Sequence, residues 1–178
     1  MSAGKGTWRS RNLYLIGFMG AGKSIVGKIL AEKLSRPFLD TDRMVEDKVG
    51  RTIAQIFQER GEEYFREVER EVVARATATP QTVVALGGGA ILNARNRKAI
   101  NQSGAAIYLK WEFAQLWPRL VNDRSRPLTL HLKPMEVEKL FNQRKRFYEQ
   151  ADFVIACHEP ETPEQIAQKI LRSLEVSK

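Results

Sequence analysis

Residues 17–24 read Gly-Phe-Met-Gly-Ala-Gly-Lys-Ser and match the phosphate-binding pattern G-x-x-x-x-G-K-[ST] at every position. A short apolar run over 13–16 precedes the motif, and an amphipathic segment over 25–34 follows it. A glycine-rich loop between a strand and a helix lets backbone N–H groups surround phosphate oxygens. The motif therefore predicts that Lys23 reaches the β- and γ-phosphates of a nucleotide and that the Ser24 hydroxyl holds Mg²⁺. A chance glycine-rich turn is the alternative, and the flanking strand and helix argue against it.

Apolar runs alternate with longer amphipathic segments along the chain, which predicts βαβ units and a parallel sheet. Strands are predicted at 13–17, 37–39, 82–86, 104–109 and 152–156. Helices are predicted at 23–34, 42–50, 52–59, 62–78, 94–101, 112–120, 134–150 and 163–175. The polar stretch over 121–131 lacks periodicity and is expected to be a long surface loop, of a kind that often acts as a lid.

The composition favours one folded domain. The chain has 178 residues, of which 43% are hydrophobic, and we expect a flexible tail over 1–10 followed by a single domain over 11–178. The single cysteine, Cys157, cannot form an internal disulfide and is expected to be a small buried side chain. We expect a cytoplasmic protein, because no apolar stretch approaches the length of a membrane span and no signal peptide is visible. The first twelve residues contain no acid, which leaves a fragment of an organelle-targeting leader open.

The net charge of +8 is compatible with two kinds of partner. Basic proteins often bind nucleic acid, but a site for a nucleotide and an anionic substrate also uses many arginines. The arginines are spread over several segments, and no aromatic-basic RNA motif is present. Charge alone therefore does not choose between these partners.

Two acids follow the second predicted strand, at Asp40 and Asp42. We expect the strand over 37–39 to lie beside the phosphate loop, with its carboxyl end at the edge of the sheet where ligands bind. In an extended chain, residues two apart point the same way. One carboxylate would then serve the hydration shell of Mg²⁺, and the other would accept a proton from a substrate hydroxyl. Alternatively, Asp40 or Thr41 caps the following helix.

A run of glycines, Gly87-Gly88-Gly89, comes directly after the apolar strand over 82–86. Without side chains, the backbone at a strand's carboxyl end is open to close approach by a ligand. The candidate anion-binding residues are arginines, whose planar forks suit a carboxylate. They are Arg66, which shares a helix face with Glu69, Arg126 in the expected lid, and the pair Arg144 and Arg146.

In this order and spacing, the segments resemble shikimate kinases. The resemblance is carried by 17–24, by Asp-Thr-Asp at 40–42, by Gly-Glu-Glu-Tyr-Phe-Arg-Glu-Val-Glu at 61–69, by Leu-Gly-Gly-Gly-Ala at 86–90, by Arg-Ser-Arg-Pro-Leu at 124–128 and by Arg-Lys-Arg-Phe-Tyr-Glu at 144–149. It extends from about residue 11 to about residue 174. It implies an α/β three-layer P-loop kinase fold of the nucleoside-monophosphate-kinase type, in which helices flank a five-stranded parallel sheet. Substrate-binding helices are implied near 42–78 and a lid near 119–132.

The resemblance also implies roles for individual residues. Arg66 and Arg144 are similar to the residues that clamp the shikimate carboxylate, and Glu69 to the partner that orients Arg66. Asp42 is similar to the acid that binds a ring hydroxyl and acts as a base, and Asp40 to the one that holds Mg²⁺ through water.

The remaining implied contacts concern the nucleotide and the walls of the substrate pocket. Arg126 resembles a lid residue that closes over the reacting phosphates, and Arg119 one that stacks on adenine. Phe57 and Phe65 resemble aromatic walls of the substrate pocket. Gly87, Gly88 and Gly89 resemble the loop that touches the shikimate hydroxyls. ATP binding is implied for Gly20, Ala21, Gly22, Lys23, Ser24, Ile25, Arg119 and Arg126.

The implied activity is transfer of the ATP γ-phosphoryl group to the 3-hydroxyl of shikimate, with Mg²⁺ as cofactor. The implied partners are ATP and shikimate, without nucleic acid or membrane, and the implied state is a monomer. One departure is Arg146, which stands where the family usually has proline and competes with Arg144 for the clamp position. We prefer Arg144 for its spacing to Tyr148.

Three alternatives to this function remain open. The first is another small-molecule kinase of the same fold, such as a gluconate kinase. The second is a nucleotide-dependent protein that binds nucleic acid. The third is an inactive relative that serves as a partner, against which the intact Lys23, Ser24, Asp40, Asp42 and Arg126 argue.

Overall fold

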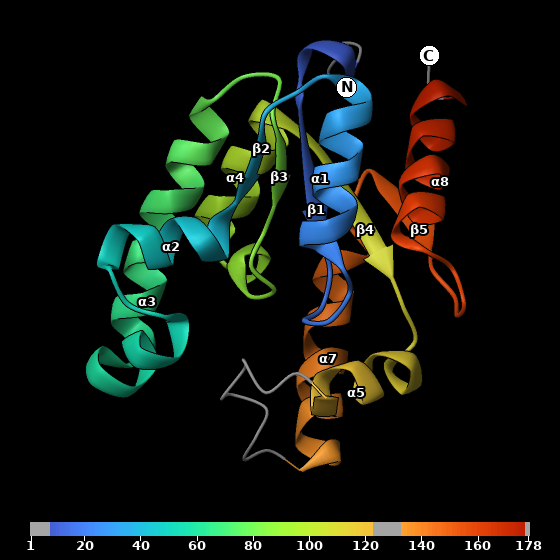
Figure 1. Ribbon diagram of the computed structural model, residues 1–178. Helices are drawn as coiled ribbons and strands as arrows, with labels where there is room; N and C mark the ends of the chain where they lie inside the picture. The colour runs from blue at the N-terminus through green and yellow to red at the C-terminus, as the bar shows by residue number, and fades with distance from the viewer. Residues whose placement is uncertain (1–7, 123–132, 177–178) are drawn as a thin grey trace.

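The computed structural model describes residues 8–122 and 133–176. Its centre is a five-stranded sheet in the order β2-β3-β1-β4-β5 (Figure 1). The strands are β1 (Asn12–Ile16), β2 (Phe38–Asp40), β3 (Val83–Ala85), β4 (Gly104–Lys110) and β5 (Phe153–Ala156), and all neighbouring pairs are parallel. Each predicted strand agrees with an observed one to within one residue at either end.

The central strand β1 determines where the phosphate motif lies. All five of its residues are buried, and Leu13 is paired with Val83 of β3 on one side and Ala105 of β4 on the other. A parallel strand covered on both faces is largely apolar, as this one is apart from Asn12. The motif therefore leaves the middle of the sheet at the carboxyl ends of the strands. As expected, β2 ends at the same edge of the sheet as the phosphate loop, and Asp40 contacts Ser24, although β3 lies between β1 and β2.

Helices cover the sheet and extend beyond its carboxyl edge. They are α1 (Lys23–Leu34), α2 (Thr41–Val49), α3 (Ile53–Ala78), α4 (Ala94–Ser103), α5 (Phe113–Asn122), α7 (Pro134–Tyr148) and α8 (Pro163–Val176), with short 3-10 turns η1 (Trp8–Ser10) and η2 (Ala90–Leu92). In Figure 1, α1 and α8 lie on the near face of the sheet and α4 behind it. Helices α2 and α3 form an arm to one side, and α5 and α7 lie below the carboxyl edge.

The arm has an internal break and a small core of its own. The two helices predicted at 52–59 and 62–78 are observed as α3, interrupted at Gly61, whose φ of 78° and ψ of 175° are not helical. A positive φ of this size is readily adopted only by glycine. The arm is held together by a hydrophobic cluster of Val45, Ile56, Phe65, Val68 and Val72, separate from the main core.

The start of the described chain lies against the domain. Residues 8–10 of the expected tail form η1, and the Arg36 guanidinium donates to the Arg9 and Arg11 carbonyl oxygens at 2.5 and 2.9 Å. Residues 1–7 and most of the expected lid, 123–132, lie outside the described residues. Among the described helices, none combines the length and the apolar character needed to cross a membrane. Cys157 is buried, as expected, and burial raises the pKa of its thiol to about 12.

We predict that Gly27→Ala destabilises the fold, because α1 packs closely on the sheet at this glycine. A Cβ added there would lie 2.6 Å from Cε2 of Phe38 and 2.9 Å from Cδ1 of Leu15. Overpacking of this kind costs about 1–3 kcal/mol, which we expect to exceed the roughly 1 kcal/mol gained by replacing a helical glycine. Urea unfolding should show a net loss of about 1 kcal/mol. Lys28→Ala, on the exposed side of the same helix, is the control, and a Gly27→Ala protein as stable as the parent would contradict the close packing.

Candidate active site

The phosphate loop is shaped by glycines and closed by its lysine. Gly20 and Gly22 have φ values of 77° and 83°, a left-handed conformation that side chains disfavour. The Lys23 ammonium donates to the carbonyl oxygens of Gly17 and Phe18 at 2.9 and 3.0 Å. The loop thus presents backbone N–H groups at the start of α1, the arrangement that binds phosphate.

A pair of oxygen donors lies beside this loop. The Ser24 hydroxyl donates to Oδ2 of Asp40 at 2.5 Å, although the two residues come from different βα connections. The other oxygen of Asp40 accepts from the backbone N–H groups of Asp42 and Arg43, at 3.0 and 3.4 Å, and caps α2. A hydroxyl and a carboxylate at one place are the donors that a hard divalent cation prefers.

The extended-chain argument for Asp40 and Asp42 is wrong, because α2 begins at Thr41. Asp42 therefore lies in the first turn of a helix, and the two acids serve different parts of the site. Asp40 meets Ser24, whereas Asp42 lies against the loop after β3. Capping by Asp40, one of the two alternatives, is observed together with its contact to the phosphate loop.

The loop Gly87–Gly89 lies between the other predicted site residues. A Cβ added at Gly87 would lie 3.2 Å from Oε1 of Glu69 and 3.4 Å from Cγ of Asp42. At Gly89 it would lie 2.8 Å from Nη2 of Arg66. At Gly88 it would lie 3.6 Å from Nη1 of Arg144 and equally far from the Gly17 carbonyl oxygen. Because these three residues have no side chains, Asp42, both arginines and the phosphate loop all lie close to the glycine loop.

Glu69 forms a buried ion pair with Arg66. Nη1 of Arg66 donates to Oε2 of Glu69 at 2.8 Å, and the Glu69 side chain is only 3% exposed. Burial raises the pKa of the Glu69 carboxyl, an effect that Arg66 opposes and the charge of Asp42 reinforces. Its second oxygen, Oε1, is buried and has no hydrogen-bond partner among the described residues. The predicted pairing of Glu69 with Arg66 is thus present, at the buried end of the site.

Arg144 and Arg146 differ sharply in their surroundings. Arg144 is 9% exposed, and its guanidinium carbon lies 5.8 Å from the centre of the Phe18 ring in the phosphate loop. Arg146 is exposed, and its guanidinium lies over Phe147 at 4.9 Å. Only Arg144 is therefore close to both the phosphate loop and Gly88, which favours it for the clamp position.

Comparisons with known proteins identify the family of this chain. The family model for shikimate kinase matches residues 19–175. The shikimate kinase of Symbiobacterium thermophilum is 42% identical over 172 residues, which cover 92% of this chain and 96% of the relative. That of Persephonella marina is 41% identical over 161 residues, or 90% of this chain and 97% of the relative. The chain belongs to the shikimate kinase family.

Solved structures of the shikimate kinase family share the whole architecture. The enzyme from Acinetobacter baumannii, solved in complex with shikimate, superposes with a TM-score of 0.89 at 38% identity and covers 94% of both chains. The one from Aquifex aeolicus has a TM-score of 0.83 at 34% identity, covering 93% of this chain and 97% of the other. A gluconokinase from Sinorhizobium meliloti, at 16% identity and a TM-score of 0.62, shares the fold alone, over 94% of this chain and 93% of the other.

The structure also shows the surroundings of the other predicted residues. Arg119 lies over the Trp111 ring at 3.9 Å and is ion-paired with Glu159. The rings of Phe57 and Phe65 are 4.8 Å apart in the arm. Ile25, in the first turn of α1, is exposed. Arg126 lies outside the described residues, so its role as a lid residue stays a prediction.

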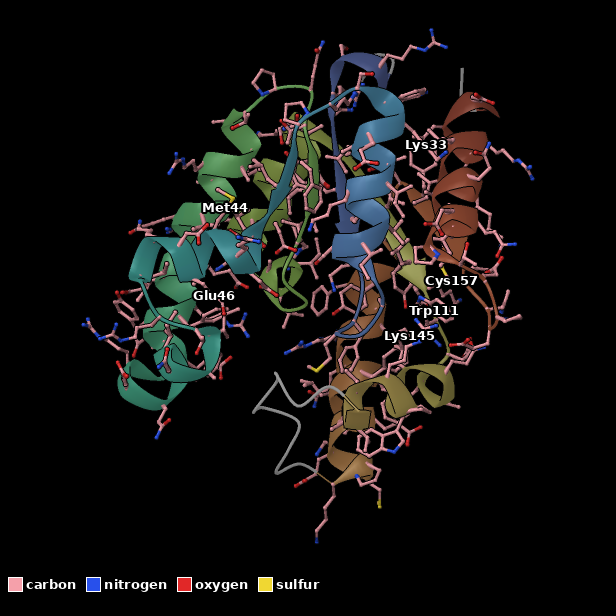
Figure 2. All side chains as sticks on the ribbon, in the orientation of Figure 1. Lys33, Met44, Glu46, Trp111, Lys145 and Cys157 are labelled. Carbon is pink, nitrogen blue, oxygen red and sulfur yellow. The ribbon has the colours of Figure 1, made fainter. Side chains whose placement is uncertain are left out.

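Three supporting contacts were not anticipated. Thr41 accepts the Gly87 N–H at 2.8 Å, and the Tyr148 hydroxyl donates to the Gly88 carbonyl oxygen at 2.6 Å. The Trp111 indole donates to the Ala21 carbonyl oxygen at 3.2 Å, at the carboxyl end of β4 (Figure 2). Spacing gives no signal for these contacts, because each joins segments that are far apart in the chain.

The Tyr148 hydroxyl is buried and stays protonated. Burial raises its pKa to about 12, although Arg144 opposes the shift. The group is therefore a neutral donor that ties α7 to the loop after β3, one helical turn from Arg144.

We predict that Arg144→Ala and Arg146→Ala have different effects on shikimate binding. Hydrogen bonds to charged groups contribute about 1.5–3 kcal/mol, so loss of Arg144 should raise the Kd for shikimate by roughly tenfold or more. Arg146→Ala should change it by less than about twofold, as expected for an exposed charge. Calorimetric titration measures both, with thermal unfolding to confirm that each variant is folded. Equal losses in the two variants would contradict the choice of Arg144.

Proposed function

We propose that this chain transfers the γ-phosphoryl group of ATP to the 3-hydroxyl of shikimate, giving shikimate 3-phosphate and ADP on the route to chorismate and the aromatic amino acids. The observation that carries the proposal is the meeting of a phosphate loop, an acid and two arginines around Gly87–Gly89, in a chain of the shikimate kinase family. The 3-hydroxyl comes from the family resemblance.

The donor half of the site is the loop after β1. Backbone N–H groups around Gly20–Ser24 would hold the phosphates of ATP, with Lys23 turning from its carbonyl partners toward the β- and γ-phosphates. Kinases that use ATP work with a divalent metal ion, and we infer that here it is Mg²⁺. Ser24 would bind it directly and Asp40 through water, since their oxygens are adjacent. Bound there, Mg²⁺ would neutralise phosphate charge.

The acceptor half of the site lies across Gly88 from the phosphate loop. Arg66 and Arg144 would hold the carboxylate of shikimate, because both guanidinium groups are at the glycine loop. Asp42 would orient the hydroxyl and take its proton as that oxygen attacks the γ-phosphorus and the bond to the ADP oxygen breaks. When its carboxylate is held in place, the acceptor reacts with the bound nucleotide as in an intramolecular reaction. This lowers the entropic part of the activation barrier.

The remaining predicted contacts complete the proposal. Arg126 would close over the reacting phosphates and exclude water, Arg119 would stack on adenine, and Phe57 and Phe65 would line the acceptor pocket. We infer a cytoplasmic monomer whose positive charge serves two anionic substrates rather than nucleic acid. A nucleic-acid-binding role would leave Asp42 and the glycine loop without a purpose.

The test is an assay of ADP release with shikimate, with gluconate and with no acceptor. We expect release that depends on shikimate, with little in the other two reactions, because the acceptor site is built to bind a carboxylate and a ring hydroxyl together. Lys23→Ala should abolish the activity. Turnover with gluconate but not shikimate would assign the chain to another acceptor, and near-normal activity of Lys23→Ala would refute the phosphate-loop assignment.

A further inference from the structure

Two carboxylates share the donors of Arg66. Nη1 donates to Glu69 at 2.8 Å, while Nε and Nη2 both donate to a single oxygen of Glu62, at 3.2 and 3.0 Å. The edge of the guanidinium made by Nε and Nη2 is one that a planar carboxylate can bind with two parallel hydrogen bonds. In this structure that edge is taken by a side chain of the same helix.

The two carboxylates are not equally easy to displace. The Glu69 side chain is 3% exposed, and breaking a buried ion pair leaves an uncompensated charge, which is costly. The Glu62 side chain is 66% exposed and four residues from Arg66 in the helix, and such pairs contribute little. Of the two carboxylates on Arg66, Glu62 is therefore the one that an arriving anion displaces at the lower cost.

The break in α3 gives Glu62 a favourable position that does not depend on Arg66. Gly61 is not helical, so Glu62 stands at the start of the second helical segment. A negative charge is favoured near a helix N-terminus, because the N–H groups there are unpaired. Once released from Arg66, the Glu62 carboxylate keeps both this favourable position and its contact with water.

We propose that Glu62 occupies the place of the acceptor's carboxylate on Arg66, and that it weakens acceptor binding by competing with it. The inference rests on the proposed function, in which Arg66 binds a carboxylate. It makes Glu62 a residue that sets acceptor affinity, and it assigns opposite effects to the two glutamates on one arginine. Glu62 competes with the ligand, whereas Glu69 orients the guanidinium for it.

The test is calorimetric titration of shikimate into the whole protein and into three single variants. Glu62→Gln, which removes the competing charge at nearly constant size, should lower the Kd by about twofold to fivefold. Glu69→Gln should raise it, because Arg66 loses its buried partner. Glu63→Gln, which alters an exposed neighbour of Glu62, should leave it unchanged.

The direction in which the Kd for shikimate changes decides whether the inference holds. A merely structural role for Glu62 would weaken binding, so an equal or higher Kd in Glu62→Gln overturns the inference while the proposed function stands. Tighter binding in Glu69→Gln would also overturn it, because the two glutamates would then act alike. If the parent protein binds no shikimate, the proposed function fails and the inference fails with it.

Discussion

The site depends on a stretch of backbone without side chains, placed by the order of the strands. Because β3 lies between β2 and β1, the loop that follows it lies between the helix start that carries Asp42 and the phosphate loop. Any larger residue at Gly87 or Gly89 would meet Asp42 or Arg66 at less than ordinary contact distance. The two halves of the site can approach each other only because Gly87–Gly89 leaves room for them.

The two arginines proposed to bind the acceptor also have contacts within the protein. Arg66 is held by the buried Glu69, and Arg144 lies one turn from Tyr148, whose hydroxyl is bonded to Gly88. The ion pair with Glu69 fixes the Arg66 guanidinium before a ligand arrives, which reduces the conformational entropy that binding must remove. Glu69 lies near Asp42 as well, and the charge of Asp42 adds to the effect of burial in raising the pKa of the Glu69 carboxyl.

The sequence was most informative where local pattern determines structure. Apolar runs predicted the five strands, and 17–24 predicted the phosphate loop, because each depends on neighbouring residues. The two helices predicted at 52–59 and 62–78 are separated where α3 is broken at Gly61. Contacts between distant segments were beyond reach: the order of the strands in the sheet was not predicted, and Trp111 gave no sign of its bond to Ala21. The contact between Glu62 and Arg66 follows from a spacing of four, but only the structure shows that Glu62 takes the Nε and Nη2 donors of Arg66. The choice of Arg144 over Arg146 likewise needed their burial.

The most direct test of this account is the effect of Gly88→Ala on turnover of shikimate. A Cβ there would lie at ordinary contact distance, 3.6 Å, from Arg144, Gly17 and Met19, so the fold should accept it. The added methyl group would nevertheless stand between the phosphate loop and Arg144, where we propose that the acceptor binds. We predict an unfolding temperature close to that of the parent and a fall in kcat/KM for shikimate of roughly tenfold or more, or about 1.4 kcal/mol. A stable Gly88→Ala protein with unchanged kcat/KM would contradict the claim that the acceptor binds across this glycine.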